Sequence, residues 1–227
     1  MYAVDMLGMG FSDRPPGLDC SLRASAERLL RFLDEVGVVS CDLLGTSQGG
    51  AVAMMAAALA PDRVRRLILA DPANPWSAQG RRLAAFLSNR AVSARFVRLA
   101  PFFKVAHNLV LRRLYGDVRR ISPGTLEGYS LPVAIPGTLA HALGILRSWD
   151  RDLQELKSML PRIADIPTLL IWGSLDRAVS PASATALREH FQNCRLVIMD
   201  SVGHLPYEEA PEEFNRVVGE FLAAPLG

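Results

Sequence analysis

The sequence predicts an α/β fold, in which a mostly parallel sheet carries helices on both faces and a helical insertion interrupts the core. Three observations support this prediction. Short apolar runs alternate with amphipathic segments in the first and last thirds of the 227-residue chain, as in sheets covered on both faces. The middle, from Trp76 to Leu160, shows no strand pattern. The alternation then resumes, so we expect residues 1–75 and 161–227 to form the core and residues 76–160 a helical lid.

The first third predicts helices and strands in strict alternation. Apolar residues at helical spacing form one stripe from Ser21 to Val36, and Gly37 follows as a stop signal. The expected elements are a helix over 21–36, a strand over 38–44, a helix over 48–60 that ends at Pro61, and a strand over 64–70. Short links of this kind are typical of β-α-β units in a parallel sheet.

The last third continues this alternation, whereas the middle is helical. Prolines divide the middle into arginine-rich amphipathic segments, which predict helices over 91–99 and 102–115. The elements expected after the lid are a strand over 167–172, a helix over 181–191, a strand over 195–199, and a closing helix over 211–222.

Composition and charge exclude several classes of protein. Half of the residues are apolar and 21% are charged, as in globular proteins. A net charge of +2 is too small for the clustered basic surface that nucleic-acid binding requires. No apolar run reaches the roughly 18 to 20 residues of a membrane span, and the N-terminus carries no signal-peptide pattern. We therefore expect a small-molecule substrate as the partner, and the sequence leaves a homo-oligomer open.

The cysteines give no indication of a disulfide framework or a zinc site. Cys20, Cys41 and Cys194 are odd in number, widely spaced, and form no C-x-x-C pair. This usage favours a reducing compartment, so we expect a cytoplasmic location and no metal.

The strongest local motif is a G-x-S-x-G segment, which runs from Gly45 to Gly49 between a predicted strand and a predicted helix. A turn this sharp strains the backbone of Ser47, and we expect side chains at Gly45 or Gly49 to collide with their neighbours. The turn exposes the Ser47 hydroxyl and aims the Gln48 N–H at a developing oxyanion. We predict Ser47 as a nucleophile and Gln48 as an oxyanion donor; a glycine-rich turn that only starts a helix is the alternative.

A serine nucleophile needs a general base, and four histidines are available. His107, His141 and His190 fall within predicted helices, whereas His204 follows the last predicted strand. Loops after parallel strands are where α/β folds present functional side chains. We therefore predict His204 as the base.

The base in turn needs a carboxylate that holds its imidazole in one tautomer. Asp176 lies in the loop directly after the predicted strand over 167–172. Asp71, at the end of the strand over 64–70, is also placed to reach a histidine. We favour Asp176 as the acid and keep Asp71 as the alternative; a capping or loop role is expected for whichever is not used.

These motifs together resemble the α/β-hydrolase family, specifically its lidded serine esterases and carbon–carbon hydrolases. The Asp5–Asp13 segment is similar to the family's D-x-x-G-x-G-x-S loop after the fourth strand, and Ser47, Asp176 and His204 follow in the family's order. A serine at the turn argues against the epoxide hydrolases and haloalkane dehalogenases of this fold, which use aspartate there. The resemblance implies hydrolysis without a metal or organic cofactor.

The resemblance also implies an N-terminally truncated fold. Family members place three strands and a helix before the D-x-x-G-x-G loop, so residues around Val4 would belong to the fourth strand. The absent part would hold the His-Gly loop that supplies the second oxyanion donor. The Val4 segment would pair with the strand over 38–44, pair elsewhere, or leave an exposed sheet edge.

Three functions remain open from the sequence. The leading hypothesis is hydrolysis of a carboxylic ester, or a similar small acyl compound, through an acyl-enzyme. The same triad could hydrolyse a carbon–carbon bond in a dienoic ring-cleavage product, and a chain without one oxyanion donor could be a catalytically impaired hydrolase or a binding protein. Apolar lid residues suggest an apolar acyl or aryl group, although packing would explain each equally well; they are Phe86, Phe96, Phe102, Phe103, Leu109 and Leu111.

Overall fold

The computed structural model describes residues 1–77, 86, 89 and 104–225. In this part of the chain, four parallel strands form one sheet in the order β1-β2-β3-β4. The strands are β1 (Cys41–Thr46), β2 (Val64–Ala70), β3 (Thr168–Gly173) and β4 (Cys194–Met199). Because all four strands run in the same direction, their carboxyl ends meet at one edge of the sheet.

Helices cover both faces of this sheet, as the sequence predicts. Leu67 and Trp172 point to one face and pack with α1, α2 and α8, whereas Ile68 and Ile171 point to the other and pack against α10. This alternation follows from the two-residue period of a strand. The covering helices are α1 (Leu22–Glu35), α2 (Gln48–Leu59), α8 (Ala182–Arg188) and α10 (Pro211–Ala223).

The strand β1 begins three residues later than the sequence pattern predicts. Val38 continues the end of α1, since its N–H donates to the carbonyl of Leu33 at 2.8 Å. The Arg63 guanidinium then donates hydrogen bonds to the carbonyls of Val38 and Val39 at 2.8 and 2.6 Å. These hydrogen bonds fix residues 38 and 39 outside the ladder, so the strand starts at Cys41.

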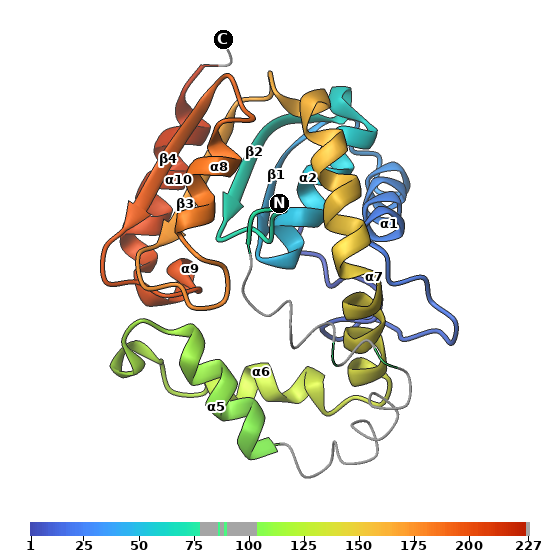
Figure 1. The fold of residues 1–227 in the computed structure, drawn as a ribbon, viewed down its shortest axis with the longest axis vertical. Coiled ribbons are helices and arrows are strands. Elements are labelled where there is room, and N and C mark those ends of the chain that lie inside the picture. Colours follow the sequence, from blue (N-terminus) through green and yellow to red (C-terminus); the bar gives the residue numbers. More distant parts are fainter. Residues whose placement is uncertain (78–85, 87–88, 90–103, 226–227) are drawn as a thin grey trace.

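The lid elements lie beyond the carboxyl ends of the strands (Figure 1). They are α5 (Lys104–Leu114), the 3₁₀ turn η3 (Val118–Arg120), α6 (Thr125–Val133) and the N-terminal part of α7 (Thr138–Met159). The predicted helix over 102–115 corresponds to α5, and the predicted helix over 91–99 lies outside the described residues. Pro132, one of the prolines expected to divide the helical segments, lies in the last turn of α6, which ends one residue later at Val133.

The helix α7 joins the lid to the core. Its N-terminal part lies beside α6, while Leu153 and Leu156 near its end belong to the core cluster of α1 and α2 (Figure 1). The buried carboxylate of Asp152 accepts the Leu22 N–H at 2.9 Å, at the start of α1. The short turns η1 (Pro61–Arg63) and η4 (Leu160–Ile163) and the helix α9 (Pro206–Glu209) complete the described elements.

The predicted strand around Val4 is not formed, because residues 1–20 contain no strand or helix. The Tyr2 ring packs edge to face on Phe32 of α1, with centroids 5.7 Å apart. The Asp5 carboxylate accepts the Phe11 N–H at 2.9 Å and so closes the D-x-x-G-x-G loop on itself. Of the three expected arrangements, the exposed edge is the one observed: among the described strands, β1 pairs with β2 alone.

No single helix among the described residues is both long and apolar enough to cross a membrane. One pair of helices, Thr125–Val133 and Thr138–Ile163, meets the length and composition criteria only when both are counted together, and the two are bent by 82°.

Candidate active site

Four polar residues follow four neighbouring strands at the carboxyl edge of the sheet. Ser47 comes directly after β1 and Asp71 directly after β2. Asp176 lies in the loop after β3, and His204 lies in the loop after β4. Because the strands are adjacent and parallel, the topology gathers residues that are up to 157 positions apart in the sequence.

Ser47 has a strained backbone, with φ 49° and ψ −122°. Its N–H donates to the Ala70 carbonyl of β2 at 3.0 Å, and its carbonyl accepts the N–H groups of Gly50 and Ala73 at 3.0 and 2.9 Å. Such strain persists only where surrounding bonds fix the chain. The turn therefore holds a half-buried Ser47 side chain at the amino end of α2.

The glycines of this turn are not equivalent, which corrects one expectation. A Cβ at Gly45 would lie 2.4 Å from the Gly49 carbonyl oxygen, and a Cβ at Gly50 would lie 2.6 Å from Pro72. A Cβ at Gly49 would meet nothing within 4 Å. The expected collision at Gly49 is therefore wrong, because Gly49 contributes its backbone to the close contact and its own Cβ direction is open.

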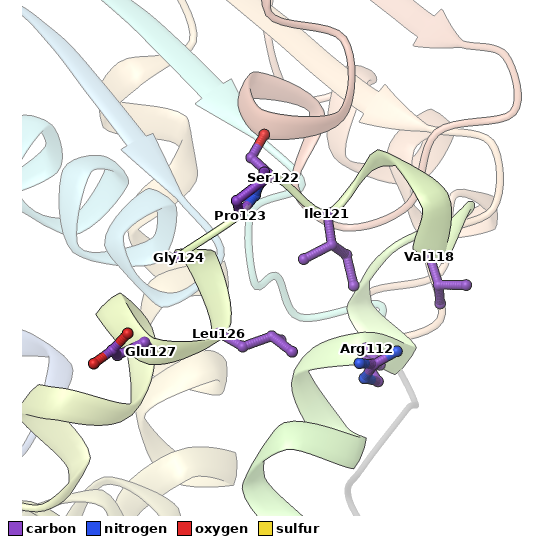
Figure 2. Close-up of a pocket in the computed structure, with 8 residues that line it drawn as sticks. All are labelled: Arg112, Val118, Ile121, Ser122, Pro123, Gly124, Leu126 and Glu127. Atoms are coloured by element: carbon purple, nitrogen blue, oxygen red, sulfur yellow. The ribbon is translucent and has the colours of Figure 1, made fainter.

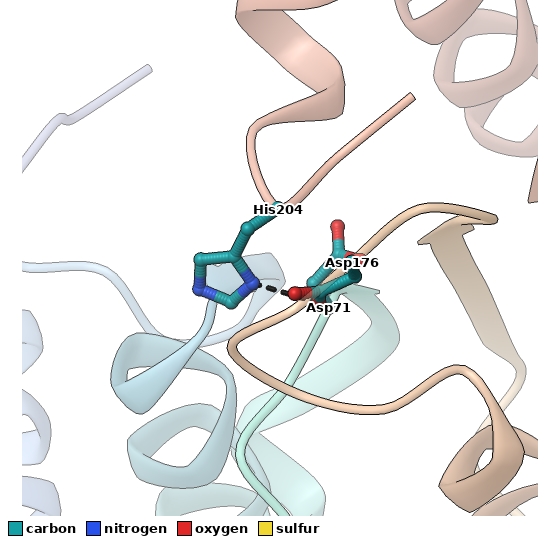
Figure 3. A group of neighbouring side chains, drawn as sticks. All are labelled: Asp71, Asp176 and His204. Atoms are coloured by element: carbon teal, nitrogen blue, oxygen red, sulfur yellow. Dashed lines mark hydrogen bonds and ion pairs between the residues drawn. The ribbon is translucent and has the colours of Figure 1, made fainter. Parts of the chain in front are cut away.

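His204 and Asp176 form a buried pair (Figure 3). Nδ1 of His204 lies 2.8 Å from Oδ2 of Asp176, and the two residues are only 4% and 5% exposed. The other carboxylate oxygen, Oδ1, accepts the N–H groups of Ala178 and Val179 at 2.7 and 3.0 Å. An ionised carboxylate only accepts, so this contact requires the proton on Nδ1 and leaves Nε2 as a free base.

Asp71, the alternative acid, is fully buried beside this pair (Figure 3). Its Oδ1 accepts the Gly173 N–H at 2.9 Å, and its Oδ2 accepts no hydrogen bond from any described residue. Burial, and then the charge of Asp176, raise the pKa of Asp71 well above its usual value. Of the two predicted acids, Asp176 is the one that bonds His204.

The three side chains have the composition of a small metal site. One ligand atom from each of Asp71, Asp176 and His204 lies within 4.8 Å of the others. The His204 and Asp176 atoms that face each other already share a hydrogen bond. A bound cation would have to replace that bond, so this donor set fits an acid and base pair better than a resident metal.

A third carboxylate, Glu209 of α9, supports the His204 loop, a role that the sequence did not indicate. It is 7% exposed and accepts N–H groups from Gly203 at 2.7 Å, from Gly116 at 3.0 Å and from Asp117 at 3.2 Å. The His204 N–H itself donates to the Leu114 carbonyl at 2.7 Å. The end of α5 is thereby bonded to the histidine loop.

The neighbouring Glu208 contacts the lid through tyrosines. Its carboxylate accepts the hydroxyl of Tyr115 at 2.5 Å and that of Tyr129. Burial, and then these hydrogen bonds, raise the pKa of both tyrosines, so both hydroxyls stay protonated as donors. Such short-range contacts place α5 and α6 against α9.

Two of the other histidines, His141 and His190, have structural surroundings. His141 of α7 is buried, and its Nδ1 lies 3.3 Å from Sγ of Cys20. Burial, and then Arg28 and Arg14, lower its pKa, which favours the neutral imidazole. His190 stacks on Trp76 with centroids 4.7 Å apart, and His107 lies within α5.

A cavity of about 360 Å³ lies within the lid, between α5, η3 and α6. Figure 2 shows the side chains of Val118, Ile121 and Leu126 directed toward the same space, with Arg112 beside them. Its lining contains none of the carboxyl-edge residues, and we assign it no role in the chemistry.

The apolar lid residues give limited support to an apolar substrate pocket. Leu111 is 4% exposed and packs with Tyr115 and Leu205, which is a structural role. Phe86 and Leu109 are more than half exposed. Phe96, Phe102 and Phe103 lie outside the described residues.

Comparison with known proteins identifies the family. A family model described as the alpha/beta hydrolase fold matches residues 1–211. The chain belongs to this family. Alpha/beta hydrolases similar to it include esterases, lipases and carbon–carbon hydrolases, and the family acts on small molecules.

Two relatives and one solved structure illustrate the range. A 2-hydroxymuconate semialdehyde hydrolase of Pseudomonas putida is 29% identical over 226 residues, which cover 98% of this chain and 76% of that protein. An sn-1-specific diacylglycerol lipase of Mus musculus is 26% identical and is matched over 93% of this chain and 68% of its own length. Cfl2 of Burkholderia cenocepacia shares the fold, with a TM-score of 0.79, 21% identity, and coverage of 96% of this alpha/beta hydrolase and 76% of Cfl2.

Proposed function

We propose that this chain is a serine hydrolase that cleaves a carboxylic ester, or a similar small acyl compound, through an acyl-enzyme. The observation that carries the proposal is the buried hydrogen bond between His204 and Asp176, at the same sheet edge as the strained Ser47. Nucleophile, base and orienting acid are the three groups that such chemistry requires.

The reaction begins with attack of the Ser47 hydroxyl oxygen on the carbonyl carbon of the substrate. Nε2 of His204 accepts the hydroxyl proton, and Asp176 stabilises the imidazolium that forms. Collapse of the tetrahedral intermediate expels the alcohol, which takes that proton from His204. A water molecule then attacks the acyl-enzyme by the same route, and the products are the carboxylic acid and free Ser47.

The amino end of α2 supplies an oxyanion donor in this proposal. The first N–H groups of a helix have no partner within the helix, and the helix dipole favours negative charge at that end. Gln48 is the first residue of α2 and directly follows the nucleophile. Its N–H is therefore assigned to the oxyanion of the tetrahedral intermediate, where one donor typically contributes about 3 kcal/mol.

Carbon–carbon bond hydrolysis is the second candidate, and one observation favours it. The Pseudomonas putida relative that is matched over 98% of this chain is named a 2-hydroxymuconate semialdehyde hydrolase. The same three side chains would serve such a dienoate: water adds to the aldehyde or ketone carbonyl and the bond to the neighbouring carbon breaks. That carbon takes up a proton, and the carbonyl fragment leaves as a carboxylic acid. The diacylglycerol lipase relative favours an ester instead.

A fluorophosphonate probe tests the shared machinery before any substrate is known. We expect the wild-type chain to be labelled at Ser47, and Ser47→Ala to remain folded and unlabelled. Labelling that persists in Ser47→Ala would assign the nucleophile elsewhere. A folded wild-type chain that resists the probe would favour a binding protein over an enzyme.

A substrate pair separates the two candidate reactions. Turnover of p-nitrophenyl esters of increasing acyl length would be compared with turnover of a 2-hydroxy-6-oxo-dienoate. Efficient cleavage of the esters alone supports the ester hydrolase. Faster cleavage of the dienoate than of the esters would support carbon–carbon bond hydrolysis instead.

A further inference from the structure

Two carboxyl groups share one buried space at the carboxyl edge. Asp71 is 0% exposed and Asp176 is 5% exposed. A carboxyl oxygen of each lies within 4.8 Å of the other and of an imidazole nitrogen of His204. The catalytic scheme above uses Asp176 and His204 and leaves Asp71 without a task, although Asp71 is a buried, titratable group in direct reach of both.

We propose that Asp71 is a positioning residue, which rests on the proposed function: it is the protonated member of the pair, and its carboxyl O–H donates to the Asp176 carboxylate. A carboxylic acid differs from a carboxylate in having a donor. That difference accounts for Oδ2 of Asp71, which is buried and receives no hydrogen bond from any described residue. As a donor, this oxygen needs an acceptor, and the Asp176 carboxylate is the neighbouring acceptor, with an oxygen of each carboxyl group within 4.8 Å of the other.

The hydrogen bonds decide which of the two carries the proton. Asp176 accepts three: from the N–H groups of Ala178 and Val179, and from Nδ1 of His204. Asp71 accepts one, from the Gly173 N–H. Donors directed at a carboxylate favour its ionised form, and burial without such donors disfavours it. The proton therefore resides on Asp71.

The charges around Asp71 also favour its protonated form. Asp176, and then Glu209, act on it with negative charge, and the phenol of Tyr207 is also nearby. His204 is the one group in this cluster that can become positive. Ionisation of both aspartates would place two like charges in a site with no permanent cation among these groups.

A neutral Asp71 would act on the reaction through Asp176. It links the end of β3, through Gly173, to the acid that orients His204. The pair then carries one negative charge, which an imidazolium balances in the transition state. Asp71 itself touches neither substrate nor Ser47 in this scheme, so its contribution is to hold Asp176 in the orientation that bonds Nδ1.

Two substitutions at Asp71 test its proposed hydrogen bond to Asp176 without changing the backbone conformation. Asp71 has φ 45°, a conformation that asparagine and glycine tolerate better than alanine does. In Asp71→Asn, the amide oxygen can accept the Gly173 N–H and the amide NH₂ can donate to Asp176, as the protonated acid does. Asp71→Gly keeps the backbone conformation and removes both hydrogen bonds.

The kinetic test compares these variants with wild type, using the ester substrate and the rate of fluorophosphonate labelling. We expect Asp71→Asn to stay within about threefold of wild type, and Asp71→Gly to lose about tenfold to a hundredfold in kcat, the equivalent of one hydrogen bond to a charged group. If Asp71→Asn were as inactive as Asp176→Asn, Asp71 would be the ionised acid. If Asp71→Gly kept full activity, no positioning role would remain.

Infrared difference spectroscopy gives a readout that needs no activity. The spectrum of Asp71→Asn is subtracted from that of the wild type, both recorded at neutral pH. The difference should contain the carbonyl stretch of one protonated carboxylic acid. A folded wild-type chain without that band would overturn the proposal. A band in a chain that resists the fluorophosphonate would instead count against the proposed function and leave the protonated Asp71 standing.

Discussion

The Glu209 carboxylate accepts the Gly203 N–H at 2.7 Å, one residue before His204, and the same carboxylate accepts the Gly116 and Asp117 N–H groups of the lid. The two backbones also touch, since a Cβ at Gly116 would lie 2.9 Å from the Gly203 nitrogen. The position of the proposed base is thereby coupled to the position of the lid, through a side chain that takes no part in the reaction.

Glu209→Gln should lower both stability and turnover. The amide has one accepting oxygen, and its NH₂ group cannot accept, so at least one buried N–H loses its partner. Such a loss costs about 1 to 3 kcal/mol in the free energy of unfolding. We expect urea unfolding to show that loss, and kcat to fall because the His204 loop is held less firmly.

Glu208→Gln is the matched control for this prediction. The Glu208 carboxylate anchors the same lid segment through Tyr115 and Tyr129. Its backbone N–H donates to the carbonyl of Leu205, next to His204, at 2.9 Å, a bond that the substitution leaves in place. We expect it to lower stability and to leave kcat nearly unchanged. Equal losses of kcat in both variants would mean that lid docking alone, and no specific hold on the histidine loop, explains the effect of Glu209→Gln.

Gly45→Ala and Gly49→Ala should have opposite effects on stability. The Gly45 Cβ would press against the Gly49 carbonyl at 2.4 Å, and neither backbone can move without disturbing Ser47. The Gly49 Cβ would enter open space within α2, where alanine is favoured over glycine by up to about 1 kcal/mol. Thermal unfolding of the two variants measures this, and a Gly49→Ala loss as large as that of Gly45→Ala would contradict the geometry.

The pattern of apolar residues was sufficient to predict the four strands and the helices that cover them, whereas the order of the strands in the sheet came from the structure. The stretch from Leu67 to Ala70 in β2 and the stretch from Leu169 to Trp172 in β3 are continuous apolar runs, as expected for strands covered on two faces. The positions of Ser47, Asp71, Asp176 and His204 after strands then placed them at one edge. The choice between Asp71 and Asp176 needed coordinates, since both follow apolar strands and only the loop geometry decides which one reaches His204.

Other features had no signal in a single sequence. In the sequence, Glu209 lies in an acidic helical segment that resembles a solvent-exposed helix face. Its partners Gly116 and Asp117 are 93 and 92 residues away in the chain. Pairing across that separation depends on how the lid folds back. The family resemblance assigned the Val4 segment to a strand, but a strand needs a hydrogen-bonded neighbour, and the Tyr2 ring packs on Phe32 of α1 instead.

Asp176→Asn should reduce kcat far more than Asp71→Asn does. The amide can present its NH₂ to Nδ1 and favour the wrong tautomer of His204, a change that lowers kcat by about 10⁴-fold in a serine protease. Asp176→Asn also removes the charge that opposes ionisation of Asp71, so an ionised Asp71 could replace part of the lost function. The double variant Asp71→Asn with Asp176→Asn should therefore be slower than Asp176→Asn alone. Additive effects would show that Asp71 offers no such replacement.

The stability of Asp71→Asn relative to wild type should rise with pH. The pKa of Asp71 is raised in the folded chain, whereas an aspartate in the unfolded chain titrates near 3.9. Below that pH both states hold the proton and the ionisation contributes nothing. Above it the unfolded chain releases the proton while the folded chain keeps it, so wild type loses up to about 1.4 kcal/mol per pH unit until the folded pKa is reached.

Asparagine does not titrate and escapes this loss, whereas the other ionisable groups are common to both chains and cancel in the difference. Urea unfolding of the two proteins from pH 4 to pH 7 measures it directly. Parallel curves would mean that Asp71 titrates normally. A difference that instead favoured wild type as the pH rose would mean that the folded chain stabilises the ionised form, and Asp71 rather than Asp176 would then be the charged acid beside His204.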